Sequence, residues 1–246
     1  MTAQDDRWVI VSGAGGALGS ALAEHYAGHG RRVLALDRRF DPAKPSPKGI
    51  TARTVDLLAE ADVSRAITES LGAGEGISLL VNAVGQIWNE PLLAFRGTKL
   101  ATHSLATWRS VSDANLTAPF VVATQVAARM VRHGGGSIVN FSSIASRGNA
   151  GQAAYSAAKA GIEGLTRAMA SELGPLGVRV NALALGFIDV PTTREAVVES
   201  RLQHYAENTP LGRLGRVNEV IDAVEFLATN DFVNGTIVRI DGGLRL

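Results

Sequence analysis

Short, continuously apolar runs alternate with longer amphipathic stretches along almost the whole chain. Strands that are buried on both faces of a parallel sheet are apolar without interruption, whereas half-exposed strands alternate apolar and polar residues. Continuous runs lie at 8–11, 32–36, 78–81, 137–141, 178–183 and 236–240. Helical patterns separate them at 18–28, 64–71, 108–133, 153–173 and 218–228. This succession predicts an α/β fold: a doubly wound parallel sheet (Rossmann fold) with right-handed crossovers.

The alternation contains no internal repeat and no linker, so we expect residues 1–246 to form a single domain. The least periodic part, 86–104, predicts an irregular excursion over the carboxyl end of the sheet, where α/β folds bind ligands. This segment and a second one, 187–210, are predicted to cover the substrate. Their large apolar side chains indicate a partly apolar pocket: Trp88, Leu92, Leu93, Phe95, Phe187 and Tyr205.

The charge balance and the missing residue types exclude several classes of function. Lys and Arg total 24 against 23 Asp and Glu, so the basic excess typical of nucleic-acid binding is absent. The chain has no cysteine, which excludes a thiolate nucleophile and cysteine-bound zinc, and its five histidines lack metal-ligand spacing. No apolar run approaches the roughly 18 residues of a membrane span, and the N-terminus does not resemble a signal peptide. We therefore expect a cytoplasmic protein without metal, membrane or nucleic-acid partners.

A glycine-rich turn follows the first predicted strand directly and leads into a helical pattern. Glycines allow the backbone to approach a pyrophosphate closely, and a helix N-terminus offers free N–H groups to it. The strict G-x-G-x-x-G pattern would need glycine where Leu18 stands, so a tight loop without a ligand is the alternative. The residues expected to contact a dinucleotide are Gly13, Gly15, Gly16, Ala17, Leu18 and Gly19.

Asp37 ends the second predicted strand, where a carboxylate can accept hydrogen bonds from an adenosine ribose. The same charge repels a 2′-phosphate, so Asp37 favours NAD(H) over NADP(H). Arg38 and Arg39 follow at once and could offset that repulsion, which keeps NADP(H) possible. Asp56 and Leu57, after the third strand, are candidates for contact with the adenine edge.

Tyr155 and Lys159 are four residues apart in a helical pattern, and this spacing places them on one face of the helix. A free tyrosine has a pKa of about 10, and a nearby ammonium group favours the phenolate and lowers that pKa. The pair predicts an acid/base unit that moves a proton to or from an alcohol oxygen while hydride moves at carbon. Taken alone, this spacing is common on helices.

Two further polar positions support this interpretation. Ser142 and Ser143 end a strand shortly before Tyr155, so that a hydroxyl could hold a carbonyl oxygen near the tyrosine. Asn115 is a poor helix former inside an otherwise apolar helical pattern. Its amide needs a partner, for which a water-mediated proton relay and a local backbone hydrogen bond are both open.

Together these motifs resemble the short-chain dehydrogenases/reductases, in the single-domain branch that includes 3-oxoacyl-carrier-protein reductases. The resemblance extends from Trp8 to Gly243. It rests on the glycine turn, 80–85, Asn115, Ser143, Tyr155, Lys159, 185–188 and 241–243.

The resemblance implies a role for each of these residues. Tyr155 would be the general acid/base, and Lys159 would lower its pKa and hold the nicotinamide ribose. Ser143 would orient the substrate oxygen, and Asn115 would maintain a water relay. Asn82 and the backbone after Gly186, including Ile188, would position the cofactor. The family also implies a homotetramer formed through the helices at 108–133 and 153–173.

The chain departs from the family pattern at several places. Ala17 stands where the glycine turn usually has a third glycine, and Ala83-Val84 replaces an Asn-Ala pair. Leu185 replaces a proline, and Val190 replaces a threonine whose hydroxyl would meet the nicotinamide carboxamide. Ser143 lies one residue nearer to Tyr155 than is usual, so Ser142 competes for its role.

These observations predict an NAD(P)-dependent oxidoreductase that interconverts a ketone and a secondary alcohol, with NAD(H) favoured. The expected substrate is partly apolar, either cyclic or acyl, with a 3-oxoacyl thioester as the alternative substrate. The competing hypothesis is a non-catalytic dinucleotide-binding scaffold or sensor.

Overall fold

Seven parallel strands form the central sheet, in the order β3-β2-β1-β4-β7-β8-β9. The computed structural model describes residues 6–40, 46–191, 193 and 199–244. The chain reverses its direction of winding at β1, which pairs with β2 on one side and β4 on the other. The predicted doubly wound Rossmann sheet is therefore confirmed. The strands are β1 (Trp8–Ser12), β2 (Val33–Asp37), β3 (Ile50–Thr54), β4 (Ile77–Asn82), β7 (Gly136–Ser143), β8 (Val178–Leu185) and β9 (Ile237–Ile240).

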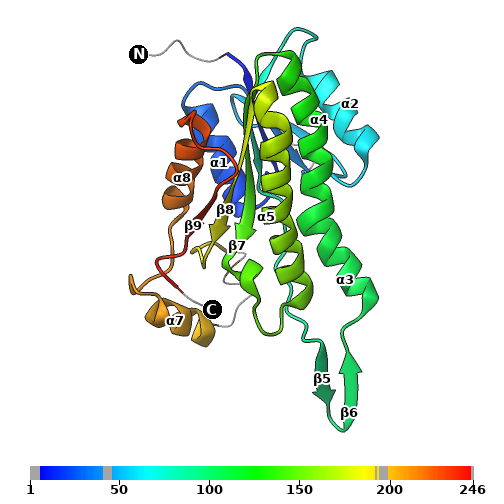
Figure 1. The fold of residues 1–246 in the computed structure, drawn as a ribbon, viewed down its shortest axis with the longest axis vertical. Helices are drawn as coiled ribbons and strands as arrows, with labels where there is room; N and C mark the ends of the chain where they lie inside the picture. The colour runs from blue at the N-terminus through cyan, green and yellow to red at the C-terminus, as the bar shows by residue number, and fades with distance from the viewer. Residues whose placement is uncertain (1–5, 41–45, 192, 194–198, 245–246) are drawn as a thin grey trace.

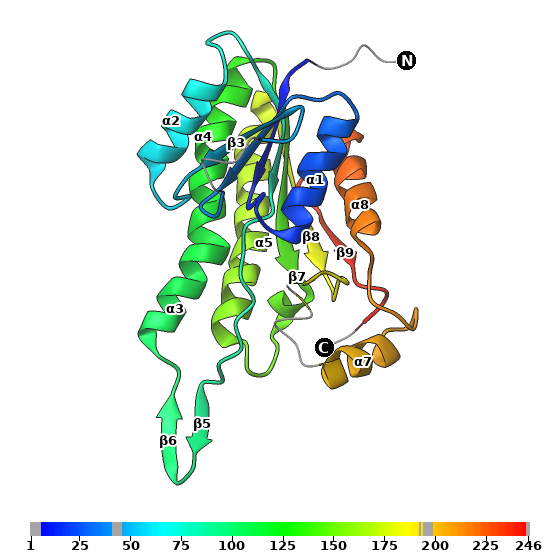
Figure 2. The ribbon, with the colours of Figure 1, turned by 180° about the vertical axis from the view of Figure 1, so that it is seen from behind.

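Helices cover both faces of this sheet (Figures 1 and 2). One face carries α2 (Glu60–Ser70), α4 (Ala118–Arg132) and α5 (Ala153–Leu173); the other carries α1 (Ala17–Gly28) and α8 (Val217–Thr229). Ile10 packs into the first layer and its neighbours Val9 and Val11 into the second, and all three are fully buried. A strand that supplies two cores must be apolar at every position, which explains the continuous runs. Among the described residues, no helix has the length and apolarity needed to cross a membrane.

The helix predicted over 108–133 is divided into three parts. It consists of α3 (Leu105–Ser112), a π-helical turn (Asp113–Thr117) and α4. Pro119 lies at the start of α4 and has no N–H to donate to the carbonyl one turn earlier. The wider π turn accommodates this lost hydrogen bond, and it places Asn115 at the irregularity.

The prediction that 86–104 is irregular holds for 86–92, which contain no helix or strand, but not for the residues that follow. Strands β5 (Leu93–Arg96) and β6 (Lys99–Thr102) form an antiparallel hairpin that closes at Gly97, whose φ is +64°. In this hairpin Phe95 lies opposite Leu100, and both side chains are exposed. Figure 1 shows the hairpin extending beyond the body of the domain, on the carboxyl side of the sheet.

Candidate active site

Two adjoining cavities open at the carboxyl end of the sheet. The larger, of about 930 Å³, runs along the glycine turn, the end of β2 and the start of α2. The smaller, of about 160 Å³, contains Tyr155 and Lys159. Both are lined by Leu18 and by residues 83–87, so they form one continuous cleft. A large lobe followed by a small reactive lobe suits a dinucleotide with a substrate beyond it.

Close backbone packing, as well as the approach of a ligand, requires glycine in the glycine turn. Gly13 has a φ of +73°, and a side chain there would lie 2.6 Å from the Cα of Val84. A side chain at Gly19 would collide with the Gly13 carbonyl. Gly13, Gly16, Ala17, Leu18 and Gly19 line the larger cavity, as predicted for a dinucleotide site.

Gly15 acts through Asp37 rather than by lining the cavity. Its N–H donates to Oδ2 of Asp37 at 2.9 Å, and a side chain at Gly15 would lie 2.9 Å from the Asp37 carboxyl carbon. Arg39 donates to both oxygens of the same carboxylate, from its backbone N–H and from its guanidinium. Burial by itself raises the pKa of Asp37, but the hydrogen bonds from Arg39 and Gly15 lower it below its usual value. Asp37 is therefore an ionised carboxylate that is already partnered by a cation.

Asp56 and Leu57 lie along the same cavity, beyond Asp37. Oδ1 of Asp56 accepts from the N–H of Leu58 at 3.0 Å, which fixes the turn before α2. Leu57 is buried and offers an apolar surface. Their position agrees with the predicted contact to an adenine edge.

Asn82, predicted to position the cofactor, lines neither cavity. Its amide accepts from Ser12 at 2.8 Å and donates to Asn140 at 2.9 Å and to the Pro119 carbonyl at 3.2 Å. Asn140 in turn donates to Thr166 of α5 at 3.0 Å. Asn82 is fully buried in a polar ladder that joins β1, β4, β7 and α5. Its hydrogen-bonding capacity is used to brace the sheet below the site.

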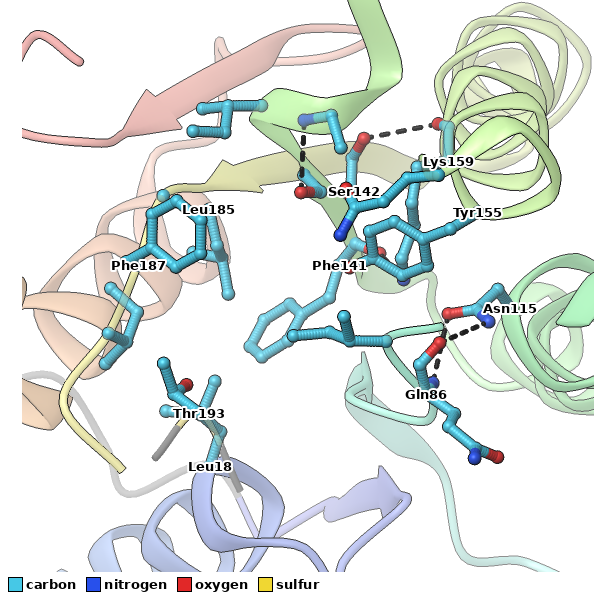
Figure 3. A pocket seen from close by; sticks show the side chains of 18 of the residues that line it. Leu18, Gln86, Asn115, Phe141, Ser142, Tyr155, Lys159, Leu185, Phe187 and Thr193 are labelled. Atoms are coloured by element: carbon cyan, nitrogen blue, oxygen red, sulfur yellow. Dashed lines mark hydrogen bonds between the residues drawn. The ribbon is translucent and has the colours of Figure 1, made fainter. Parts of the chain in front are cut away.

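Tyr155, Lys159 and Ser143 meet in the smaller cavity, and Figure 3 shows how the first two lie. The hydroxyl of Ser143 lies beside the Tyr155 phenol and lowers its pKa. Lys159 donates from Nζ to the Phe141 carbonyl at 2.8 Å, and Nζ lies 5.7 Å from the centre of the Tyr155 ring. Ser142 points instead toward α5, where it donates to the Lys159 carbonyl at 3.2 Å and to Glu163 at 3.1 Å. Of the two serines, Ser143 is the partner of the tyrosine.

The pKa of Tyr155 shifts upward, and Lys159 is not among the groups that shift it. Burial raises the pKa of Tyr155 to about 12, against a smaller lowering by the Ser143 hydrogen bond. Burial also lowers the pKa of Lys159 to about 8. Both shifts have one cause: each side chain loses water that would stabilise its charged form. The tyrosine is therefore a neutral phenol near neutral pH.

Asn115 fastens one peptide of the cavity wall. Its Nδ2 donates to the Gln86 carbonyl at 2.9 Å and to the Val111 carbonyl at 3.0 Å, and its Oδ1 accepts from the Gln86 N–H at 3.1 Å. The π turn frees the Val111 carbonyl for this contact. The sequence left a water-mediated relay and a backbone hydrogen bond open for the Asn115 amide. The structure shows hydrogen bonds of this amide to the backbone. Figure 3 shows the two bonds to Gln86.

Apolar side chains line the opposite side of the smaller cavity. Leu185, Phe187, Ile188 and Val190 face it from the end of β8 and the segment beyond. The ring of Phe187 stacks on Tyr205 of α7 (Glu199–Asn208), with centroids 3.9 Å apart and planes at 14°. The predicted cover at 187–210 thus contacts the site through Phe187, while residues 192 and 194–198 lie outside the described residues.

The sequence as a whole matches known proteins over nearly its full length. Residues 13–245 match the family model described as enoyl-(acyl carrier protein) reductase. The short-chain reductase protein NovJ of Streptomyces niveus is 35% identical, over 95% of this chain and 92% of its own. The chain is a short-chain dehydrogenase/reductase.

Relatives of this short-chain dehydrogenase/reductase include the 3-oxoacyl-[acyl-carrier-protein] reductase FabG of Aquifex aeolicus, 34% identical over 96% of both chains. A 3-hydroxyacyl-CoA dehydrogenase type-2 from Mycobacterium avium has the same fold, with a TM-score of 0.88 and 31% identity over 100% of this chain and 99% of its own. A gluconate 5-dehydrogenase from Burkholderia cenocepacia, solved with NADP and tartrate, also has this fold. Its TM-score is 0.86, and it is 30% identical over 98% of this chain and 96% of its own. The protein is an NAD(P)-dependent oxidoreductase, and the predicted resemblance to 3-oxoacyl reductases is confirmed.

Residues of this short-chain dehydrogenase/reductase that the sequence did not indicate also line the cleft. Arg109 lies along the larger cavity from α3. Thr193 is buried against the smaller cavity near Leu18, three residues after Val190 (Figure 3). Asn149 and Gln152 line the same cavity shortly before Tyr155. The sequence signal that could have identified Asn149 and Gln152 as site residues is their position in the loop that leads into the helix of Tyr155.

Proposed function

We propose that this protein reduces a ketone to a secondary alcohol, and catalyses the reverse oxidation, with Tyr155 as the proton-transferring residue. The meeting of Tyr155, Ser143 and Lys159 in one small cavity carries this proposal, because that cavity adjoins a larger one that suits a dinucleotide. Two hydroxyls that line the same cavity can both bond one carbonyl oxygen.

The nicotinamide cofactor supplies the chemistry of hydride donation to, or acceptance from, the substrate carbon. With its pKa near 12, the Tyr155 phenol is protonated at neutral pH and is the form that donates a proton to the developing alkoxide. Ser143 holds the same oxygen in place. Lys159 is cationic below about pH 8, and the Phe141 carbonyl fixes its ammonium beside the tyrosine. Its charge stabilises the phenolate that remains after proton transfer.

The residues of the larger cavity fit a dinucleotide, with the N-terminus of α1 at Ala17 and an acceptor at Asp37. We infer a preference for NAD(H), because a 2′-phosphate would meet the Asp37 carboxylate. Arg39, which already lies on that carboxylate, makes NADP(H) a usable second cofactor.

A partly apolar ketone, cyclic or acyl, is the substrate class that we propose. The apolar wall around Phe187 supports it, since such a wall favours hydrocarbon over a free sugar. A 3-oxoacyl thioester is the alternative, supported by relatives named as 3-oxoacyl reductases.

Tyr155→Phe tests the proposed function. It removes the transferable proton but keeps the ring, so ketone reduction should fall at least about 100-fold while NADH binding is retained. A panel of cyclic ketones, acyl ketones and 3-oxoacyl thioesters with both cofactors gives the readout. If the wild-type protein binds NADH yet reduces no member of the panel, the scaffold or sensor hypothesis replaces the enzyme.

We also propose a homotetramer formed through the helices predicted at 108–133 and 153–173. Exposed apolar side chains on α3 and α4 support this, namely Leu105, Trp108 and Phe120. Light scattering at micromolar concentration tests it, and a monomeric mass would contradict it.

A further inference from the structure

Three side-chain amides form a chain at the rim of the smaller cavity. Nδ2 of Asn149 donates to Oε1 of Gln152 at 2.9 Å. Nε2 of Gln152 donates to Oδ1 of Asn89 at 2.7 Å. Asn149 and Gln152 both line the cavity that contains Tyr155 and Ser143. The chain therefore joins the loop before α5 to the segment after β4 across the opening of the site.

This arrangement fixes the orientation of Gln152. A primary amide has two N–H donors and an oxygen with two acceptor positions. Asn89 takes one donor of Gln152, and Asn149 occupies one acceptor position. The N–H of Asn149 donates to the Ser156 hydroxyl at 3.2 Å, which ties the loop to the first turn of α5. Gln152 thus retains one donor on an amide that is held from both sides.

The remaining N–H donor of the Gln152 amide lies in the same part of the site as Tyr155. Gln152 is the N-cap of α5, Tyr155 follows three residues later, and both line the same small cavity. Among the described residues that line the smaller cavity, Lys159 is the charged one, and its ammonium is directed at the Phe141 carbonyl. The rim is therefore suited to a neutral oxygen acceptor rather than to a carboxylate.

We propose that Gln152 is a specificity-determining residue whose remaining N–H binds a second, neutral oxygen of the substrate while Tyr155 and Ser143 hold the reacting carbonyl. This proposal rests on the proposed ketone reduction and narrows its substrate class. The substrate is an oxygenated ketone, such as a keto ester or keto thioester, with its hydrocarbon part against the apolar wall at Phe187. A buried or pre-oriented donor left without its acceptor is costly, so the site selects against ketones that lack this oxygen.

The test compares two ketones of equal chain length, ethyl 3-oxobutanoate and heptan-2-one, of which only the first carries an ester group with a second carbonyl oxygen. In the wild-type enzyme we expect kcat/KM to favour the keto ester. Gln152→Leu should lower kcat/KM for the keto ester about tenfold, the size expected for one hydrogen bond, and change that for heptan-2-one less than about twofold. Gln152→Glu keeps the shape but has no N–H donor, so it should lower the keto-ester value at least as much.

Two further variants separate specificity from structure. Asn89→Ala removes the partner that orients Gln152 and should give a partial loss, about threefold, for the keto ester alone. Gln125→Leu is the matched control, because Gln125 lies on α4, is partly exposed and bonds Glu60, and neither residue lines the cleft.

The outcomes are distinguishable. Equal losses for both ketones in both Gln152 variants, or an unchanged ratio between them, would overturn the role of Gln152 while leaving ketone reduction intact. A wild-type enzyme that binds NADH but reduces neither ketone would refute the proposed function and this role together. An unfolded Gln152→Leu variant, judged by its thermal transition, leaves the decision to Gln152→Glu and Asn89→Ala.

Discussion

The guanidinium of Arg39 bonds both oxygens of the Asp37 carboxylate, with Nε 3.0 Å from Oδ1 and Nη2 3.1 Å from Oδ2. This pair lies at the end of β2, along the larger lobe of the cleft. It partly neutralises the charge that distinguishes NAD(H) from NADP(H), so the two residues have opposite effects on cofactor preference.

Replacing each member of this pair should therefore shift cofactor preference in opposite directions. Arg39→Ala leaves Asp37 without its cation, so the ratio of the NADPH to NADH dissociation constants should rise about tenfold. Asp37→Ala leaves Arg39 free to meet a 2′-phosphate, so the ratio should fall by at least as much. Fluorescence titration with both cofactors measures the ratio, with Arg65→Ala on α2 as the exposed control. Shifts in the same direction in both variants would contradict the assignment.

The pH dependence of ketone reduction should follow Lys159. Its ammonium is present below a pKa of about 8 and is lost above it, whereas the Tyr155 phenol persists up to about 12. The kcat/KM for reduction should therefore be level below about pH 7 and fall as the pH rises through about 8. Steady-state rates between about pH 6 and 10 measure this.

Lys159→Met is the companion variant for that pH profile. It should reduce the rate at least about 100-fold, and the decrease near pH 8 should disappear. A wild-type profile that rises through pH 8 in the reduction direction would show that a different ionisation controls the reaction.

Asn115→Ala should affect both stability and turnover. It removes three hydrogen bonds and leaves the N–H and carbonyl of Gln86 without this partner, which should cost about 1–3 kcal/mol of unfolding free energy. Because Gln86 lines both cavities, kcat should fall as well. Urea denaturation and steady-state kinetics measure the two effects, and Asn218→Ala on the exposed side of α8 is the control. Full activity together with full stability would contradict a positioning role for Asn115.

Asn82→Ala should affect stability far more than cofactor choice. The substitution leaves buried groups on Ser12 and Asn140 unpaired, at a cost of about 2–4 kcal/mol. Since the Asn82 side chain lies in the sheet and not in the cleft, the NADPH to NADH ratio should change less than about twofold. A change in that ratio as large as that of Asp37→Ala would show that Asn82 contacts the cofactor after all.

Much of the fold could be predicted because its signals are local. The helix predicted over 153–173 has these same bounds in the structure, and the predicted apolar runs form six of the seven strands of the main sheet. The strand missing from those runs, β3, lies at the edge of the sheet and is only half-buried, so its residues need not be apolar. Tyr155 and Lys159 share a cavity because a spacing of four residues places side chains on one face of any helix.

The sequence by itself determined the doubly wound sheet, the glycine turn, Asp37 and the Tyr155–Lys159 pair, since periodicity and strand ends are properties of neighbouring residues. Only the tertiary structure decided that Ser143 lies beside the tyrosine while Ser142 is directed at α5, that Asn82 braces the sheet, and that Gln152 is held by Asn89. It also decided the direction of the Tyr155 pKa shift, because burial outweighs the lowering by Ser143. Hydrogen-bond partners and desolvation depend on groups that are distant in the chain, and they exist only once the chain has folded.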